Sequence, residues 1–348
     1  MRRALPVIPA ISLDWRSGAR YGRANCRGVG TVSSNYMPKV ELGPCDIGAY
    51  KAGNTGVAYV TSFYSGRSGP HVMVNALTHG NEVCGAHALR FLFENQVRPT
   101  RGRLTLGFAN VDAYLRFDAD SPFDTRFVDE DFNRVWDLAV LDGSATSVEL
   151  ARARAMRPIV NTVDLLLDLH STPLPNDPML LAGTRDKGLA LARAIGYPTQ
   201  VVIDAGHADG RRLRDYDGFD DPASLKASLL VECGQHFEKP AAAVAIETTL
   251  RFLRHCDIID PAIEALRPVA DAAAQMVTRV TEAVTIGSQR FAFERELSGF
   301  EVIPEAGTLI AHDGEIEIRT PYDNCVMIMP ARDVKPGLTA VRLGEMVE

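Results

Sequence analysis

The sequence alternates between short apolar segments with the character of buried β-strands and longer segments with helical periodicity. The strand-like segments lie at 71–77, 103–110, 163–170, 200–204 and 228–232, and helical spacing occurs at 82–95, 147–160, 186–196 and 241–255. Chains that alternate in this way form a mostly parallel sheet with helices packed on both of its faces. The sequence therefore predicts an α/β fold built on a parallel or mixed sheet.

The pattern changes near residue 276, after which short β segments follow one another between Gly, Pro and Asp turns. Residues 1–40 are rich in Gly, Arg and Ser and show no sustained periodicity. We therefore expect an N-terminal arm of residues 1–40, an α/β domain of residues 41–275 and a β-rich C-terminal domain of residues 276–348.

Composition narrows the classes of partner. The chain has 348 residues, a net charge of -7 and no long Lys/Arg run, which disfavours nucleic acid and anionic membranes as partners. No apolar run approaches the ~18 residues of a membrane-spanning helix. The six cysteines are scattered singly, and Pro6 and Pro9 interrupt the apolar start that a signal peptide would need. We expect a cytoplasmic protein with reduced thiols, and the sequence leaves a homo-oligomer open.

Four of the strand-like segments run into polar residues. Segment 71–77 is followed by Thr-His-Gly-Asn-Glu, and the other three end at Asn110, His170 and Glu232. In open α/β sheets, ligands bind beyond the carboxyl ends of the strands. The pattern therefore places two histidines and two glutamates at the edge where a site is expected.

His79 and Glu82 are spaced to bind one metal ion from a strand-to-helix turn, and Gly80 allows the backbone to turn sharply between them. His170, from another strand, would complete the two-histidine, one-carboxylate set that catalytic zinc uses with an open position for water. For His79 alone, a hydrogen-bonded loop histidine is the plain alternative. The ligand set also accepts other divalent metals.

Two carboxylates accompany these ligands. Asp168 lies two residues before His170, so both side chains share one face of the strand, and Asp168 could orient the imidazole. It could equally pair with another polar group under the site. Glu232 follows a buried apolar run, where a carboxylate is costly unless it is paired or functional. Near zinc it could take a proton from the metal-bound water and pass it to a leaving amine, and the plain alternative is an ordinary strand-end glutamate.

The segment from Arg126 to Trp136, RFVDEDFNRVW, carries two arginines. Arg126 could stabilise a developing oxyanion, and the forked guanidinium of Arg134 could bind a substrate carboxylate with Asn133 as a further donor. The plain alternative is a charged loop and a helix start capped by Asp131.

In combination, the motifs ALTHGNE (76–82), Arg126 with DFNR (131–134), LLDLH (166–170) and LLVECGQ (229–235) are specific. Across roughly residues 45–240 the chain resembles the succinylglutamate desuccinylase/aspartoacylase family, relatives of the zinc carboxypeptidases. The resemblance implies a carboxypeptidase-like fold with a β-rich tail and one Zn²⁺ per chain. The residue roles that it implies are metal binding by His79, Glu82 and His170, proton transfer by Glu232, polarisation of the scissile carbonyl by Arg126, and binding of a substrate carboxylate by Asn133 and Arg134.

The rest of the substrate pocket is less defined. The loop at 207–219 is rich in arginine, and from it we predict that Arg214 and Tyr216 contact the substrate. His236, four residues after Glu232, is a further candidate for lining the pocket.

These observations lead to the hypothesis of a zinc-dependent deacylase that hydrolyses the amide bond of a small N-acyl amino acid or a related carboxylate-bearing amide. A carboxypeptidase acting on peptides is the alternative, since an Asn-Arg pair suits a C-terminal carboxylate equally well. A non-catalytic metal-binding protein is a third hypothesis. Segment 307–330 is similar in pattern to carriers of biotin or lipoate, but it lacks the lysine that such carriers modify.

Overall fold

A computed structural model of the chain describes residues 37–206, 209–266, 274–331 and 333–347. The expected N-terminal arm lies outside the described residues except for 37–40. Among the described helices, none is long and apolar enough to cross a membrane.

Within the described residues, eleven strands form one mixed sheet in the order β1-β3-β2-β4-β7-β5-β6-β8-β14-β13-β10. Its centre consists of parallel strands: β3 (Arg103–Phe108), β2 (His71–Ala76), β4 (Leu165–Thr172) and β7 (Ala227–Gln235). These strands are apolar and almost wholly buried, as expected for a parallel sheet that is covered on both faces.

Shorter strands flank this centre. β1 (Val60–Tyr64) pairs antiparallel with β3 at one edge. On the other side, β5 (Met179–Leu181) runs antiparallel to β7, and β6 (Gln200–Ile203) runs parallel to β5. The sheet is therefore mixed, with its parallel part at the centre where the candidate site residues lie.

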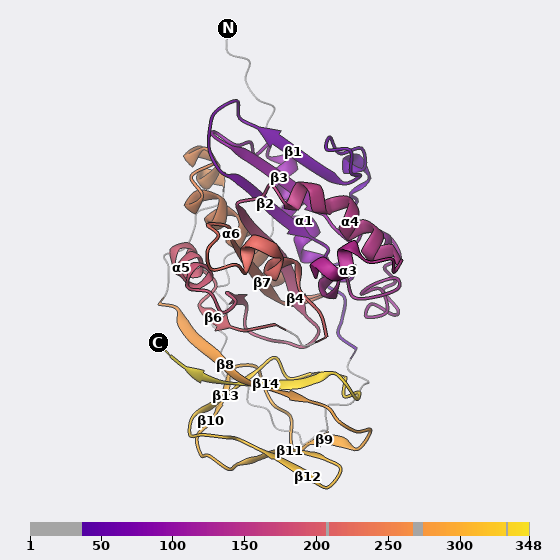
Figure 1. Cartoon of the computed structure of the whole chain (residues 1–348), viewed down its shortest axis with the longest axis vertical. Helices are drawn as coiled ribbons and strands as arrows, with labels where there is room; N and C mark the ends of the chain where they lie inside the picture. Colours follow the sequence, from indigo (N-terminus) through magenta and orange to yellow (C-terminus); the bar gives the residue numbers. More distant parts are fainter. Residues whose placement is uncertain (1–36, 207–208, 267–273, 332, 348) are drawn as a thin grey trace.

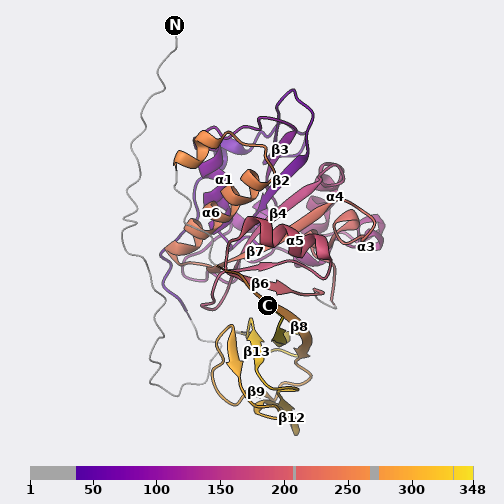
Figure 2. The same ribbon diagram turned by 90° about the vertical axis from the view of Figure 1, so that its left-hand side faces the viewer.

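Helices cover both faces of this sheet (Figures 1 and 2). The helices on one face are α1 (Cys84–Glu94), α5 (Asp186–Ile195) and α6 (Lys239–His255), and their apolar side chains join the larger core cluster. The helices on the other face are α3 (Leu138–Asp142) and α4 (Val148–Val160), which pack with Trp136 in a second cluster. The predicted α/β fold with helices on both faces is confirmed.

Short helical segments fill the connections. They are η1 (Gly48–Tyr50), α2 (Val111–Tyr114), η2 (Phe132–Arg134), η3 (Leu213–Asp215), η4 (Asp217–Phe219) and η5 (Pro261–Leu266).

The C-terminal strands form two groups (Figure 1). The strands that extend the main sheet are β8 (Met276–Thr285), β14 (Thr339–Met346), β13 (Cys325–Ile328) and β10 (Glu301–Ile303). The separate three-stranded sheet consists of β9 (Phe291–Phe293), β11 (Leu309–Asp313) and β12 (Ile316–Arg319). Because β8 pairs with β6, the main sheet continues across the expected boundary at residue 276, and the division into domains stays a prediction.

His71, at the start of β2, is a buried titratable group outside the candidate site. Its Nε2 lies 2.7 Å from Thr105 Oγ1 and its Nδ1 lies 3.0 Å from the carbonyl oxygen of Thr162. Burial lowers the pKa of His71 from 6.5 to about 4. Folding therefore favours the neutral ring.

This shift predicts a pH dependence of stability. The folded protein binds fewer protons than the unfolded chain, so the contribution of His71 is complete above pH 6.5 and is lost as the pH falls towards about 4. Between about pH 7.5 and about pH 5 we expect the wild type to lose roughly 2 kcal/mol more of its unfolding free energy than His71→Gln. Urea unfolding at both pH values would measure this, with the exposed His255→Gln as control. Parallel losses in wild type and His71→Gln would contradict it.

Candidate metal centre and active site

The turn after β2 positions two of the expected ligands. It carries His79 and Glu82 between the end of the strand and the start of α1. A Cβ on Gly80 would lie 2.5 Å from the backbone carbonyl oxygen of Thr125, so only glycine fits this approach. The Gly80 amide donates to the carbonyl oxygen of Arg126 at 2.9 Å. The turn is therefore packed directly against the segment that carries the first arginine.

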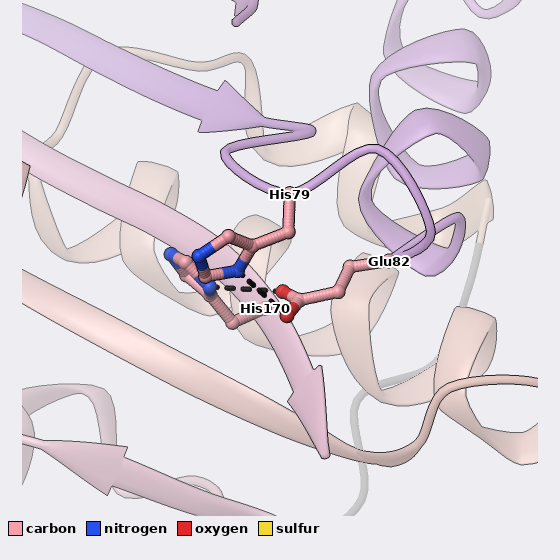
Figure 3. Close-up of side chains that lie close together, drawn as sticks. All are labelled: His79, Glu82 and His170. Carbon is pink, nitrogen blue, oxygen red and sulfur yellow. Dashed lines mark hydrogen bonds and ion pairs between the residues drawn. The ribbon is translucent and has the colours of Figure 1, made fainter. Parts of the chain in front are cut away.

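His79, Glu82 and His170 meet at one point (Figure 3). His79 Nδ1 lies 2.7 Å from Glu82 Oε1, and His170 Nδ1 lies 2.9 Å from Glu82 Oε2. One ligand atom from each residue lies within 4.8 Å of the others, and the residues are only 3%, 1% and 1% exposed. The structure thus brings the expected ligands together from the β2–α1 turn and from β4.

The far side of each imidazole faces a carboxylate. His170 Nε2 lies 2.9 Å from Asp168 Oδ2, the contact expected for Asp168, and His79 Nε2 lies 2.9 Å from Asp131 Oδ1. Both rings therefore turn Nδ1 towards Glu82. Carboxylates in this outer position fix the tautomer and orientation of metal-binding histidines.

Sequence reasoning assigned Asp131 only as a helix cap. It does accept the Asn133 amide at 2.8 Å, but the same oxygen also contacts His79. Burial opposes a charge on this carboxyl, yet His79 and Arg126 lower its pKa well below the usual range. The sequence carried no signal for the contact because 52 residues separate Asp131 from His79.

Glu232 stands beside the cluster. It is the register partner of His170 across β4 and β7. Its Oε2 is buried and accepts no hydrogen bond from the described part of the chain. Burial, and next the neighbouring Glu82 carboxylate, raise the pKa of Glu232 to about 8. A buried oxygen without a donor is costly, so the site needs a further group at this point.

The residues present fit a divalent metal. Two imidazole Nδ1 atoms and a carboxylate are the donor set of catalytic zinc. Carboxylates contact the Nε2 atoms. On the neighbouring strand, a Glu232 oxygen has no hydrogen-bond partner among the residues that the structure describes.

Arg126 reaches the cluster from its rim. Its Nη1 donates to Glu82 Oε1 at 3.3 Å, and its Nη2 donates to Asp131 Oδ2 at 3.1 Å. Nη2 also lies 2.8 Å from His79 Nε2, which can accept from Arg126 or donate to Asp131 but cannot do both in one tautomer. The side chain remains 34% exposed, so a bound molecule can meet it.

Asn133 and Arg134 lie on η2. Asn133 Oδ1 accepts the Leu213 amide at 2.9 Å, which leaves the Nδ2 donors of its amide for another partner. Arg134 Nε donates to Asp209 Oδ1 at 3.1 Å and its Nη1 donates to the Asn133 carbonyl at 2.9 Å. Arg134 Nη1 is 4.0 Å from Asp131 Oδ2, which places this guanidinium beside the cluster.

The structure does not bring Arg214 and Tyr216 to the cluster through any contact among the described residues. Arg214 is buried, and its Nη2 donates to the carbonyl oxygens of Ala182 and Ser228 at 3.0 and 3.2 Å. Tyr216 is also buried, and its ring lies 5.3 Å from that of Trp136. These contacts attach the η3–η4 segment to the sheet and give the predicted substrate role no support.

His236, the other pocket candidate, lies behind Glu82. Its Nδ1 is 2.8 Å from Ser171 Oγ, and the Ser171 amide donates to Glu82 Oε2 at 3.2 Å. Burial lowers the pKa of His236 to about 3, so the ring is neutral.

Comparison with known proteins identifies the family of this chain. The fold and the cluster define an α/β protein with a His-Glu-His cluster that could hold a metal ion at the carboxyl edge of its central strands. Residues 68–257 match the succinylglutamate desuccinylase/aspartoacylase catalytic domain, and the chain belongs to that family. The family resemblance noted in the sequence is confirmed.

Solved structures share the fold, and a curated relative is similar over part of the chain. Succinylglutamate desuccinylase from Vibrio parahaemolyticus has a TM-score of 0.62 and 16% identity, covering 84% of this chain and 87% of that one. Succinylglutamate desuccinylase/aspartoacylase from Rhodobacter sphaeroides has a TM-score of 0.59 and 17% identity, covering 83% and 89%. These identities show a shared fold. The N-acyl-aromatic-L-amino acid amidohydrolase (carboxylate-forming) of Rattus norvegicus is 30% identical over 110 residues, which is 29% of this chain and 33% of that relative.

The outer carboxylates lead to a prediction about metal affinity. Asp168→Asn and Asp131→Asn remove the charged acceptor from one imidazole each while keeping its size. We expect each variant to bind zinc roughly 10–100-fold more weakly, because such partners orient the ligand rings. Competition with a chromophoric chelator would measure the affinity. Asp209→Asn is the control, since Asp209 accepts a hydrogen bond from Arg134 Nε. Unchanged affinity in both variants would show that the Nε2 contacts do not support metal binding.

Proposed function

We propose that this protein is a zinc-dependent amidohydrolase that removes the acyl group from a small N-acyl amino acid or a related carboxylate-bearing amide. The observation that carries the proposal is the buried His79–Glu82–His170 cluster, beside which a Glu232 oxygen accepts no hydrogen bond from any described residue. The family assignment and the names of the relatives support amide hydrolysis.

In this proposal, His79 and His170 hold the zinc through Nδ1 together with the Glu82 carboxylate. Zinc bound there supplies Lewis acidity, which polarises a carbonyl and lowers the pKa of water. Asp131 and Asp168 keep the protons of the two imidazoles on Nε2.

Glu232 is the proton carrier of the reaction. Burial raises the pKa of Glu232 to about 8, and a cation on the neighbouring ligands would bring that value down. A carboxylate in this position can accept a proton from the nucleophile and donate one to the leaving amine.

The two arginines have different tasks. Arg126 is an accessible cation at the rim of the cluster, where it can stabilise the oxyanion that develops from the scissile carbonyl. Arg134, with the Asn133 amide, binds the substrate carboxylate, which is charged before the reaction begins. Asp209 holds Arg134 Nε and thereby orients the guanidinium.

A peptide-cleaving carboxypeptidase is the competing function, since Asn133 and Arg134 fit a C-terminal carboxylate equally well. The position of the C-terminal strands favours the smaller substrate. Arg342 on β14 is buried and lies 3.6 Å from Asp204, at the end of β6. Besides burial, the charges of Arg212 and Arg134 lower the pKa of Arg342, so β14 lies within electrostatic reach of the expected carboxylate site.

An activity panel tests the proposal. We expect the zinc-loaded protein to hydrolyse one or more N-acyl amino acids and to leave peptides with the same C-terminal residue largely uncut. Glu232→Gln should keep its zinc and lose at least about 10³-fold in kcat, because two proton transfers depend on it. Near-normal turnover by Glu232→Gln would remove this residue from the mechanism, and preferential cleavage of peptides would favour the carboxypeptidase.

The arginines should give separable kinetic effects. Arg126→Ala should lower kcat by roughly 10²–10³-fold, since it loses an interaction made mainly in the transition state. Arg134→Ala should raise KM most, since it loses binding that is equal in the ground and transition states. Arg134→Lys should not restore KM, because one ammonium cannot form a two-pronged contact. Steady-state kinetics on any accepted substrate would decide, and identical effects of the two alanine variants would contradict the division of tasks.

A further inference from the structure

Glu149, in the first turn of α4, is a buried carboxylate outside the metal cluster. It is 0% exposed, and it forms no ion pair with any Lys or Arg in the described ranges. An acidic residue in the first turn of a helix usually stays at the surface, where it interacts with the helix dipole. The burial of Glu149 therefore needs another explanation.

All the partners of Glu149 are hydrogen-bond donors. Oε1 accepts from the Val128 amide at 2.6 Å and from Asn110 Nδ2 at 2.9 Å. Oε2 accepts from the amides of Asp129 and Glu130 at 3.0 and 3.3 Å. Three successive backbone amides thus converge on one carboxylate, an arrangement that binds anions well.

The contact is reciprocal. Asp129 Oδ2 accepts the Val148 amide at 2.8 Å, so segment 128–130 also satisfies the start of α4. Ser147 Oγ accepts the Leu150 amide at 2.9 Å and caps the same helix. Because the donors that the Glu149 carboxylate meets among the described residues all lie outside α4, capping of α4 does not account for Glu149.

Segment 128–130 connects the two groups of residues that face the cluster. Arg126 precedes it, and Asp131 and η2 follow it. Neighbouring Phe127 is 40% exposed, and none of residues 128–130 is buried in the core, so apolar packing does little to fix this backbone. Three backbone amides of the segment donate to the Glu149 carboxylate, and the Asp129 side chain accepts from the start of α4.

Asn110 takes part in the same contact, as a donor to Glu149. It is the polar residue at the carboxyl end of β3 that the sequence singled out beside His170 and Glu232. Its Nδ2 donates to Glu149, and its Oδ1 accepts the Ala113 amide at 3.4 Å. Asn110 therefore links the Glu149 contact to the strand edge.

We propose that Glu149 is a positioning residue that sets the backbone of 128–130 and thereby places Arg126 and Arg134 relative to the metal ligands. This inference rests on the proposed function in so far as the two arginines act on a substrate. The metal ligands come from other elements, so Glu149 should control the arginines without controlling metal binding.

The test uses Glu149→Gln in the zinc-loaded full-length chain. Glutamine keeps the shape but points an amide donor at backbone donors. We expect amide hydrogen exchange at residues 128–130 to accelerate at least about tenfold while zinc content is unchanged. With an accepted substrate, kcat/KM should fall by roughly 10–100-fold, since a displacement of about 1 Å has effects of this size. The control is Glu247→Gln, another buried glutamate, which pairs with Arg251 on α6.

A combination of variants separates positioning from general destabilisation. Adding Glu149→Gln to Arg126→Ala should lower kcat by less than about threefold further, because Arg126 is the positioned arginine that acts on kcat and it is already gone. Asn110→Ala removes one donor to Glu149 and should also accelerate amide exchange at 128–130, by a smaller amount. It is the replacement variant if Glu149→Gln does not fold.

Unchanged exchange at 128–130 in the variants, or faster exchange spread evenly over the chain, would overturn the inference. Additive losses in the double variant would overturn it as well. Absence of turnover by the wild type would instead overturn the proposed function, and the exchange measurement would still decide the role of Glu149.

Discussion

The Glu82 carboxylate interacts with two imidazoles and a guanidinium in a space that is almost closed to water. Burial alone would raise its pKa, but the charges and hydrogen bonds of His79 and His170 hold the pKa well below its usual range. An unpaired charge in such a position would be very costly. The buried charge of Glu82 is therefore stable only while His79 and His170 are in place beside it.

This dependence extends one layer outwards. Asp168 is held by Asn75 and Thr78 at 2.8 Å each, and it in turn orients His170. Asp131 performs the same task for His79 and also contacts Arg126. The groups proposed to bind metal and the groups proposed to act on a substrate are thus joined through shared carboxylates. Within segment 126–134, Asp131 is the residue that contacts both groups.

Much of the fold could be predicted from the sequence, because apolar runs of strand length and helical spacing are local properties of the chain. The segments expected at 147–160 and 186–196 correspond closely to α4 and α5. Strand ends were less well predicted. β4 continues to Thr172 and β7 to Gln235, so His170 and Glu232 lie inside strands rather than at their ends. These polar residues remain part of the sheet because the backbones of β4 and β7 pair at this point, with His170 opposite Glu232.

The sequence by itself determined which residue types lie at the carboxyl edge. Motif spacing and the ends of apolar strand segments can both be read along the chain, and ligands of open α/β sheets bind beyond those ends. Tertiary structure alone decided which partners those residues have. Asp131 contacts a histidine 52 positions away, and Glu149 holds a loop 19 to 21 positions before it. Arg214, expected at the substrate, instead donates to two backbone carbonyls. A buried charge takes whichever donors or acceptors the fold brings within about 3 Å, and no local pattern records that choice.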